Sequence, residues 1–305
     1  MTRLITFSFL AFMIGCTGFG KTDNAIRGID ISFDDRQIIY CIDHGEGQDA
    51  GLYIHNTNSG FKQRLLTPQP GFKFYNPRFS STGDRIAFIE SSNDAGGSRV
   101  CVVNSNGSGF NRLTNDSNII TEVMFTSDQQ FLLYAGASEY NNYSPITVKN
   151  AHNFDIYMIN LETLERKKLT DLHAYGLYHI SSFDSSHVLF KLEAGDEGGM
   201  RMLSIDDMSI TSIEPKVDLV EGDGGLYGAP AYSMEYDLLA FTLPYRLYYM
   251  DMRTRSPIHV ESCRSQESIS FVRFFHDQKK LLFTRFNDSR IYTVDIETGQ
   301  VQFVN

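Results

Sequence analysis

Tryptophan is absent from the 305 residues, and no run of lysine and arginine occurs. The formal net charge is −10, whereas a nucleic-acid binder needs a basic surface that displaces counterions from phosphates. We therefore expect no nucleic-acid partner. The Gly-x-Ser-x-Gly elbow of α/β-hydrolases is also missing, which excludes a peptidase of that type. Hydrophobic residues make up 42% of the chain and Phe and Tyr are plentiful, which favours β structure around a large core.

Cysteine is scarce, and its pattern excludes the usual cysteine chemistry. Beyond Cys16 only Cys41, Cys101 and Cys263 remain, an odd number with spacings that match no metal-binding motif. Cys41 and Cys101 fall within predicted strands, where a free cysteine behaves as a small buried hydrophobe. We expect neither a disulfide nor a cysteine metal site.

The first segment has the features of an export signal. Arg3 precedes an apolar run over 4–14, which is too short to span a bilayer but suits a signal peptide over 1–15. The segment Met13-Ile14-Gly15-Cys16 is similar to a bacterial lipobox, so we expect a lipid on Cys16 and a small, polar tether over 16–25. An ordinary signal peptide followed by a chance cysteine is the alternative.

One unit recurs six times along residues 26–305. It consists of a polar turn followed by an apolar run that ends in an aromatic residue. These closing aromatics are 42 to 56 residues apart, close to the length of about 40–50 residues of one propeller blade. They are Tyr40, Phe88, Tyr134, Phe190, Phe241 and Phe283.

Two further strands complete each unit. The third ends in Asn or Asp, whose side chain bonds to its own backbone two residues on and so favours a turn. The third strands are expected at 52–56, 99–104, 155–160, 200–206, 246–251 and 290–295. The fourth strands are expected at 64–67, 111–114, 167–170, 210–214, 257–261 and 301–304. The pattern predicts an all-β fold, a six-bladed β-propeller of four-stranded antiparallel blades whose neighbours bury each other's faces.

The repeat resembles the TolB-like (WD40-like) β-propeller repeat. The resemblance is carried by FSSTGDRIAF at 79–88, RVCVVNSNGSGFNRLT at 99–114 and DIYMINLETLERKKLT at 155–170, and it covers roughly 24–305. It implies that ligands bind in the central channel or on one face. That face carries the loops from second to third strand and from fourth strand to the next blade. The resemblance implies the fold and not a particular function, because one fold hosts many functions.

The segment 135–153 is expected to be the longest loop of that face. Long loops in compact folds are usually functional or disordered. This one carries Tyr140, Tyr143 and His152, and aromatic groups often anchor interfaces. A drifted insertion without function is the alternative.

The expected loop 68–77 holds a second aromatic group, Phe72, Phe74 and Tyr75 beside Lys73. If these side chains are exposed, they form an apolar patch that marks an interaction site. If they are buried, they belong to the core beneath a blade junction. Both interpretations stay open from the sequence.

The segment 171–179 combines Asp171, His173, Tyr175, Tyr178 and His179. If 177–181 is an extended innermost strand, alternate residues face the channel, and His173 and His179 could converge there on a metal. The resemblance offers a parallel, since some oligogalacturonate lyases use a related propeller whose channel histidines bind a metal. A polar channel lining with structural histidines is the alternative.

Other polar groups carry weaker signals. The stretch 221–225 joins acidic residues with glycines, but it lacks the EF-hand spacing and is read as a flexible turn. His44, His187 and His276 fall in predicted turns, where we expect solvated side chains.

The sequence favours a non-catalytic binding or scaffolding lipoprotein of the cell envelope that needs no cofactor. Its partner is expected to be an envelope protein or peptide held on the loop face. The chain is expected to be exported and membrane-anchored through its lipid, on the periplasmic side or at the cell surface, and Thr17 after Cys16 favours the outer membrane. The alternative is a carbohydrate-active enzyme, similar to oligogalacturonate lyase, with a divalent metal in the channel.

Overall fold

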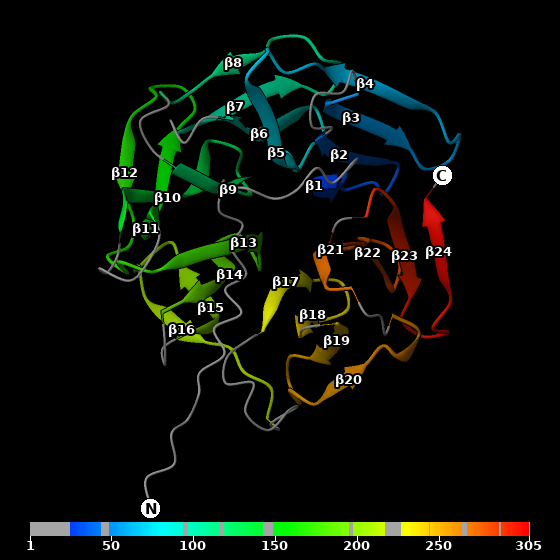
Figure 1. Ribbon diagram of the computed structural model, residues 1–305. Coiled ribbons are helices and arrows are strands. Elements are labelled where there is room, and N and C mark those ends of the chain that lie inside the picture. The colour runs from blue at the N-terminus through cyan, green and yellow to red at the C-terminus, as the bar shows by residue number, and fades with distance from the viewer. Residues whose placement is uncertain are drawn as a thin grey trace, which may run out of the picture.

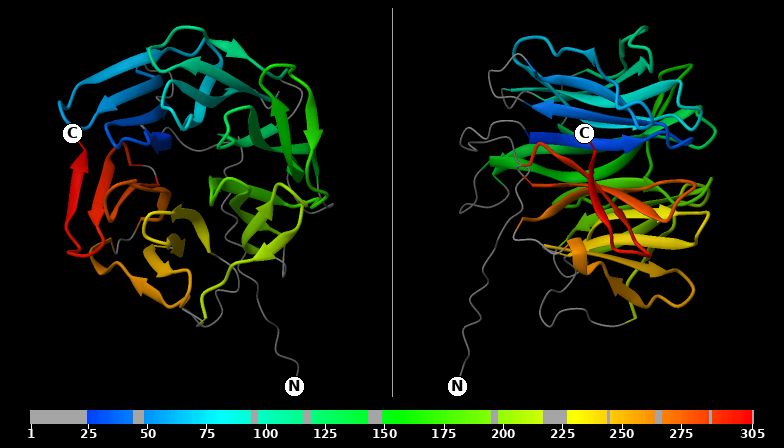
Figure 2. Two further views of the ribbon diagram at one scale, coloured as in Figure 1. Left: turned by 180° about the vertical axis from the view of Figure 1, so that it is seen from behind. Right: turned by 90° about the vertical axis from the view of Figure 1, so that its right-hand side faces the viewer.

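The computed structural model describes residues 25–43, 49–93, 97–115, 119–142, 149–194, 198–216, 227–243, 245–263, 267–286 and 288–304. Across these residues, six four-stranded antiparallel sheets surround a central axis as the blades of a propeller (Figure 1). Figure 2 shows the same ring from behind and from its side. The predicted fold, a six-bladed β-propeller with four strands per blade, is confirmed.

Each blade uses four consecutive strands that run from the centre to the rim. The innermost strands are β1 (Ala25–Ile31), β5 (Phe72–Phe79), β9 (Ile119–Phe125), β13 (Gly176–Ser182), β17 (Gly228–Ser233) and β21 (Ile269–Phe274). The second strands are β2 (Gln37–Asp43), β6 (Arg85–Ser92), β10 (Phe131–Asn142), β14 (His187–Glu193), β18 (Leu238–Leu243) and β22 (Lys280–Arg285). The third strands are β3 (Gly51–Asn56), β7 (Ser98–Asn104), β11 (Lys149–Asn160), β15 (Gly199–Ser204), β19 (Arg246–Asp251) and β23 (Ile291–Asp295). The fourth strands are β4 (Lys62–Leu66), β8 (Asn111–Arg112), β12 (Arg166–Lys168), β16 (Ile210–Ser212), β20 (Pro257–His259) and β24 (Val301–Val304).

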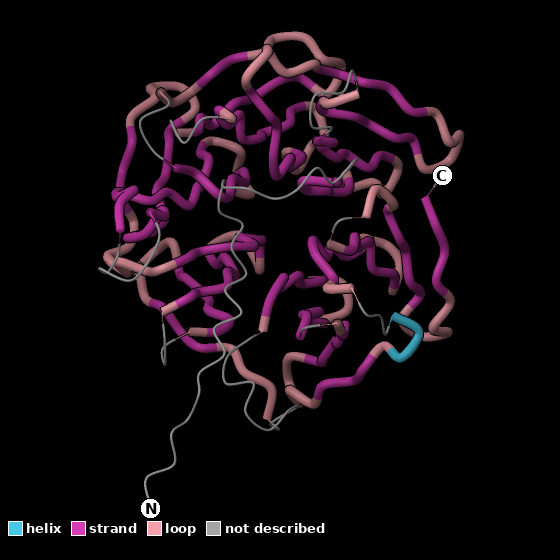
Figure 3. Tube along the Cα trace, in the orientation of Figure 1, coloured by secondary structure: helices cyan, strands magenta, loops and turns pink. Residues whose placement is uncertain are grey.

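Helix is nearly absent from the described ranges. A short 3-10 turn, η2 (Glu261–Cys263), follows β20 at the rim and is the helical segment drawn in Figure 3. None of the described segments forms a helix with the length and apolar character that a membrane crossing requires.

The core lies between the blades. Six clusters of buried hydrophobic residues occur among the described residues, one at each junction of adjacent blades. Each closing aromatic is buried in the cluster that its blade shares with the preceding blade. Phe190, for example, packs beside Phe154 of the preceding blade. A single sheet therefore leaves one face bare, and its neighbour covers that face, as the repeat pattern predicts.

The predicted turns after the third strands are largely confirmed. The Oδ1 atom of Asn56 accepts hydrogen bonds from the backbone N–H groups of Asn58 and Ser59. Asn160, Asp251 and Asp295 accept equivalent pairs from the residues that follow them. In blade 4 the third strand ends earlier than predicted, at Ser204.

Residues 135–142 and 149–153, the described parts of the segment 135–153, belong to strands and not to a loop, which corrects the prediction for blade 3. Strand β10 continues to Asn142 and β11 begins at Lys149, so the two form a hairpin that is longer than its counterparts. Its outer register pairs Glu139 with His152 and Tyr140 with Ala151. This part of the hairpin lies beyond the pairing of β9, which ends at Ala137, and most of its side chains are polar. The sequence of this outer part therefore lacks the alternation of apolar and polar residues that marks a strand, although its described backbone is paired.

The ring closes between blades 6 and 1 by packing and polar contacts, and not by a strand exchanged between their described sheets. The Asp35 carboxylate accepts hydrogen bonds from the backbone N–H groups of His276 and Asp277, at 2.9 and 3.0 Å, and lies 3.0 Å from His276 Nδ1. His276 is thus a closure residue, and the prediction of a merely solvated turn was wrong. Beside this contact, Phe275 of blade 6 packs with Ile31 and Ile38 of blade 1.

Asp35→Asn is expected to destabilise the closed ring by about 2 kcal/mol near neutral pH. Burial raises the pKa of Asp35, but the hydrogen bonds from His276 and Asp277 outweigh burial and lower it to about 2, below the ordinary 3.8. A carboxylate with a depressed folded-state pKa stabilises above its unfolded pKa, and this contribution is lost as the pH falls towards 2. Urea unfolding at a series of pH values should show wild type and variant converging below about pH 4. A difference in unfolding free energy between wild type and variant that does not change with pH contradicts this account. The control is Asp206→Asn, which lies in an exposed turn of blade 4.

Candidate binding site at the channel mouth

A pocket of about 210 Å³ opens at one end of the central channel, and all six blades contribute to it. Its walls are the starts of the innermost strands and the ends of the second strands. We call it the mouth pocket and define it by residues 25–27, 75–76, 91, 119–122, 178–179, 191, 228, 242–243, 268–271 and 285–286. It lies on the face that the repeat resemblance implies for ligands, because the loops between blades end there.

A β-bulge interrupts the innermost strand of every blade just below this pocket. Bulges increase the local twist and re-aim side chains. At the bulges Asn76 (φ 46°), His179 (φ 58°) and Phe271 (φ 26°) adopt positive φ, a conformation rare for residues other than glycine. As a result the neighbours Tyr178 and His179 both line the pocket. The prediction that alternate residues of 177–181 face the channel was therefore wrong at this point.

The lining combines apolar walls with cationic groups. The apolar residues include Ile26, Ile120, Leu243, Ile269 and Phe271. The ionisable residues are Arg27, Tyr75, Glu122, Tyr178, His179, Lys191 and Arg285. Three cations thus face one carboxylate in a protein with a formal net charge of −10. The mouth pocket is a locally basic site on an acidic protein.

The three cations differ in how they are neutralised. Arg27 Nε lies 3.6 Å from Asp43, and Lys191 Nζ lies 3.0 Å from Glu193. Arg285 has no ion pair in the described part of the chain, and its guanidinium lies over the Tyr292 ring, 4.7 Å from the centroid. Arg285 is therefore the cation most available to a ligand.

An ion network links four innermost strands around the channel. Asp30 lies 3.7 Å from Arg78 and 3.2 Å from Arg273, and Arg78 lies 3.8 Å from Glu122. Arg78 also donates a hydrogen bond to the Ile180 carbonyl oxygen at 2.5 Å. Burial and the neighbouring Arg78 lower the pKa of Arg273 to about 9, so it stays protonated at neutral pH. The network links the innermost strands of different blades and holds the Glu122 side chain at the mouth pocket.

His179 occupies the same site in an uncharged form. Burial holds the pKa of His179 well below its usual value, and the cations Lys191, Arg273 and Arg78 act in the same direction. Its Nδ1 atom is buried and has no hydrogen-bond partner in the described part of the chain. Burial also raises the pKa of Glu122, although Arg78 and the backbone N–H of His179 oppose the rise.

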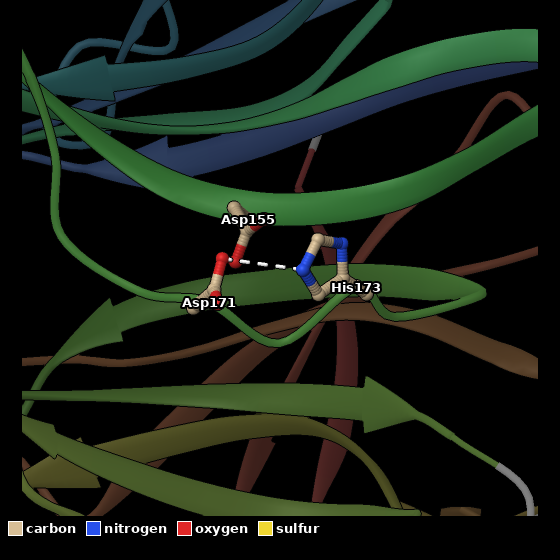
Figure 4. Close-up of side chains that lie close together, drawn as sticks. All are labelled: Asp155, Asp171 and His173. Atoms are coloured by element: carbon tan, nitrogen blue, oxygen red, sulfur yellow. Dashed lines mark ion pairs between the residues drawn. The ribbon is translucent and has the colours of Figure 1, made fainter.

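The structure does not bring His173 and His179 together at the mouth pocket. His173 is exposed and absent from the lining; its Nε2 atom lies 3.2 Å from Asp171, with Asp155 of β11 nearby (Figure 4). The ammonium of Lys168 lies 3.0 Å from Asp155 and 2.7 Å from Asp171. Hydrogen bonds to Asp171 and Asp155 raise the pKa of Lys168. The Lys168 ammonium therefore already pairs with both carboxylates of the group formed by Asp155, Asp171 and His173.

The mouth pocket offers few ligands for a divalent metal. Such ions require several oxygen or imidazole ligands. The described lining offers one carboxylate, which is paired with Arg78, and one imidazole, among Arg27, Lys191 and Arg285. Repulsion from these cations opposes a metal ion and favours an anion.

The aromatic group at 72–75 divides between core and pocket. Residues 72–77 belong to strand β5 and not to a loop, which corrects that prediction. Phe74 is buried and meets Phe88 edge to face, with ring centroids 4.9 Å apart. Phe72 is half-buried under the Arg99 guanidinium, and Tyr75 lines the mouth pocket.

The remaining predicted binding residues lie in different surroundings. His152 is buried in the hairpin, 3.1 Å from Glu139, and Tyr140 lies under the Lys149 ammonium. Tyr175 is 45% exposed beside the mouth, and Tyr178 lies in the pocket. The predictions at Tyr143, at 221–225 and at Cys16 fall outside the described residues.

Several residues of the site could not be identified from a local sequence motif. Arg27 and Arg285 stand at opposite ends of the chain, and Asp30, Arg78 and Arg273 meet only when the ring closes. The repeat alignment was the one available signal. In blades 1, 2 and 6, the residue before the closing aromatic pairs with a member of the ion network. These members are Asp30, Arg78 and Arg273.

Comparisons with known proteins identify the fold. No protein-family model matches the chain, and no curated protein matches it in sequence. A TolB from Acinetobacter baumannii aligns at 17% identity with a TM-score of 0.57, over 77% of this chain and 54% of that chain. An oligogalacturonate lyase in complex with manganese aligns at 14% identity with a TM-score of 0.58, over 91% and 77%. The nidogen/laminin complex contains a chain that aligns at 9% identity with a TM-score of 0.63, over 83% and 88%.

These likenesses concern the fold, because every identity is low. This chain spans about half the length of the TolB chain it matches. The protein is a six-bladed β-propeller, and its fold is similar to that of the propellers in TolB proteins.

Proposed function

We propose that this protein is a non-catalytic binding or scaffolding lipoprotein of the cell envelope, which holds a protein or peptide partner at the channel mouth. The observation that carries the proposal is the mouth pocket, which is lined by residues of all six blades and combines apolar walls with the cations Arg27, Lys191 and Arg285. Apolar clefts with a few placed polar groups are the usual form of a binding site. The rigid ring of blades keeps these groups in place without a partner.

The proposed anchor sets where this site would stand. Ala25 and Ile26 line the mouth pocket, so the chain enters the propeller at the mouth. A fully extended tether from Cys16 to Ala25 spans at most about 30 Å. With a lipid on Cys16, the mouth face would therefore lie within that distance of the membrane. A partner would then have to be an envelope component that reaches this space, on the periplasmic side or at the cell surface.

The test uses a photo-reactive amino acid in place of Tyr175, which is exposed beside the mouth. Irradiation of cells should crosslink the protein to one envelope protein in stoichiometric yield. The matched control places the same amino acid at Phe33, which is 67% exposed in the turn between β1 and β2 at the opposite end of the blade.

Two results would overturn parts of the proposal. No crosslink from Tyr175, or the same crosslinks from both positions, would remove the mouth as the binding face. Failure of a clickable fatty acid to label wild type, with Cys16→Ser as the unlabelled reference, would remove the anchor.

A further inference from the structure

We propose that the mouth pocket receives the C-terminal residue of the partner chain. The free carboxylate would lie against Arg285, Lys191 and His179, and an apolar side chain would lie against the isoleucines and Phe271. This inference rests on the proposed function and names the part of the partner that the site recognises. Its grounds are the size, the charge, the unpartnered donors and the walls of the pocket.

The size of the pocket favours a chain end over a longer ligand. Its volume of about 210 Å³ lies below the range of about 300–1,000 Å³ typical of pockets for drug-sized ligands. A strand or an oligosaccharide that crosses the site would need more room. The pocket lies at the axis of the ring, enclosed by all six blades, so a peptide enters it end-on.

The charge of the pocket selects an anion. Arg285 has no ion pair in the described part of the chain, and Lys191 shares its charge with Glu193, which is outside the lining. The carboxylate in the lining, Glu122, faces Arg78 at 3.8 Å. Hydrogen bonds between a carboxylate and Arg or Lys are about twice as strong as neutral ones.

Buried polar atoms without partners point to the same ligand. The Nε atoms of Arg27 and Arg285 and the Nδ1 atom of His179 are buried without hydrogen-bond partners in the described part of the chain, although Arg27 Nε also lies 3.6 Å from Asp43. The arginine atoms are donors, and His179 Nδ1 donates in the tautomer that carries its proton there. An unsatisfied buried polar group costs about 1–3 kcal/mol. A carboxylate offers two oxygens with about four acceptor sites, so one group can satisfy several donors at once.

The apolar walls specify what accompanies the carboxylate. Ile26, Ile120, Leu243, Ile269 and Phe271 supply apolar surface beside the charged groups of the pocket. A terminal leucine, isoleucine or phenylalanine carries its carboxylate next to an apolar side chain. The C-terminal end of a protein therefore matches both halves of the lining, and capture of a terminal carboxylate is a recognised mode of peptide recognition.

The test measures fluorescence anisotropy of the full chain in detergent with two fluorescein-labelled peptides. Both are short Gly/Ser peptides that end in leucine, one with a free carboxylate and the other with a C-terminal amide. We expect the acid to bind at least tenfold more tightly than the amide, and Arg285→Gln to abolish this preference. Lys191→Gln provides a second variant that does not disturb the contact between Arg285 and Tyr292. Arg253→Gln, an exposed site on the rim, should leave binding unchanged.

Equal affinity for the acid and the amide would overturn the inference, as would tighter binding of an acidic oligosaccharide that displaces the peptide. These failures differ from a failure of the proposed function. If the Tyr175 crosslink persists while acid and amide bind equally, the mouth holds a partner by other contacts and only the terminal carboxylate is wrong. If the Tyr175 crosslink is absent, the proposed function itself is contradicted, whichever peptide binds more tightly.

Discussion

Replacing Arg78 with alanine is expected to lower the free energy of unfolding by about 3–5 kcal/mol, because a broken buried ion network leaves uncompensated charge. Arg78 is 5% exposed and lies 3.7 Å from Asp30 and 3.8 Å from Glu122. It also bonds to the carbonyl oxygen of Ile180. These partners belong to blades 1, 3 and 4, so the substitution removes contacts across the channel. Urea unfolding followed by circular dichroism measures the loss.

The loss from Arg78→Ala should depend on pH. Burial raises the pKa of Glu122 above 4.5, and the charge of Arg78 opposes that rise. Without Arg78 the pKa of Glu122 rises further. A carboxyl group with a raised folded-state pKa is favourable below its unfolded pKa and loses that contribution as the pH rises through the folded value. The gap between wild type and variant is therefore larger near pH 8 than near pH 4.

Arg253→Ala is the matched control for Arg78. Its guanidinium is largely exposed and pairs with Asp251 at 3.0 Å. Exposed ion pairs of this kind contribute little, so no measurable change is expected. An equally small effect at Arg78 would show that the channel network does not hold the ring.

The blade pattern could be predicted from the sequence because it depends on local signals. Closing aromatics, turn-forming Asn and Asp, and short apolar runs recur within each unit, and each corresponds to one strand or turn. The contacts that close the ring could not be predicted in the same way. Asp35 and His276 are 241 residues apart, and their contact exists only in the closed ring.

The positions of the site residues were harder still to predict, because they depend on bulges. A bulge is a property of two paired strands and their register, and the sequence of one strand does not reveal it. Simple alternation therefore misplaced the residues around His179, which lines the pocket together with its neighbour Tyr178. Of the candidate residues predicted on the loop face, Tyr75, Tyr178 and His179 line the mouth pocket.

Gly28→Ala is expected to lower the free energy of unfolding by about 3–4 kcal/mol, from backbone strain combined with overpacking. Gly28 lies at the bulge of β1 with φ +126°, a conformation that other residues rarely adopt. A Cβ atom there would lie 2.6 Å from the Cα atom of Asn76, and backbone cannot yield as a flexible side chain does. The close approach of strands β1 and β5 therefore requires glycine. Chemical denaturation of the two proteins measures the effect.

Gly60→Ala separates the two causes. Gly60 also has positive φ, +69°, but a Cβ atom there meets nothing within 4 Å. Only the left-handed conformation then costs stability, about 1–2 kcal/mol. The substitution at Gly28 should also reach the mouth pocket, because the Asn76 it would displace donates hydrogen bonds to the Thr121 carbonyl and to Glu122. A Gly28→Ala protein that matches Gly60→Ala in both stability and peptide affinity would show that the strands separate without cost at this point.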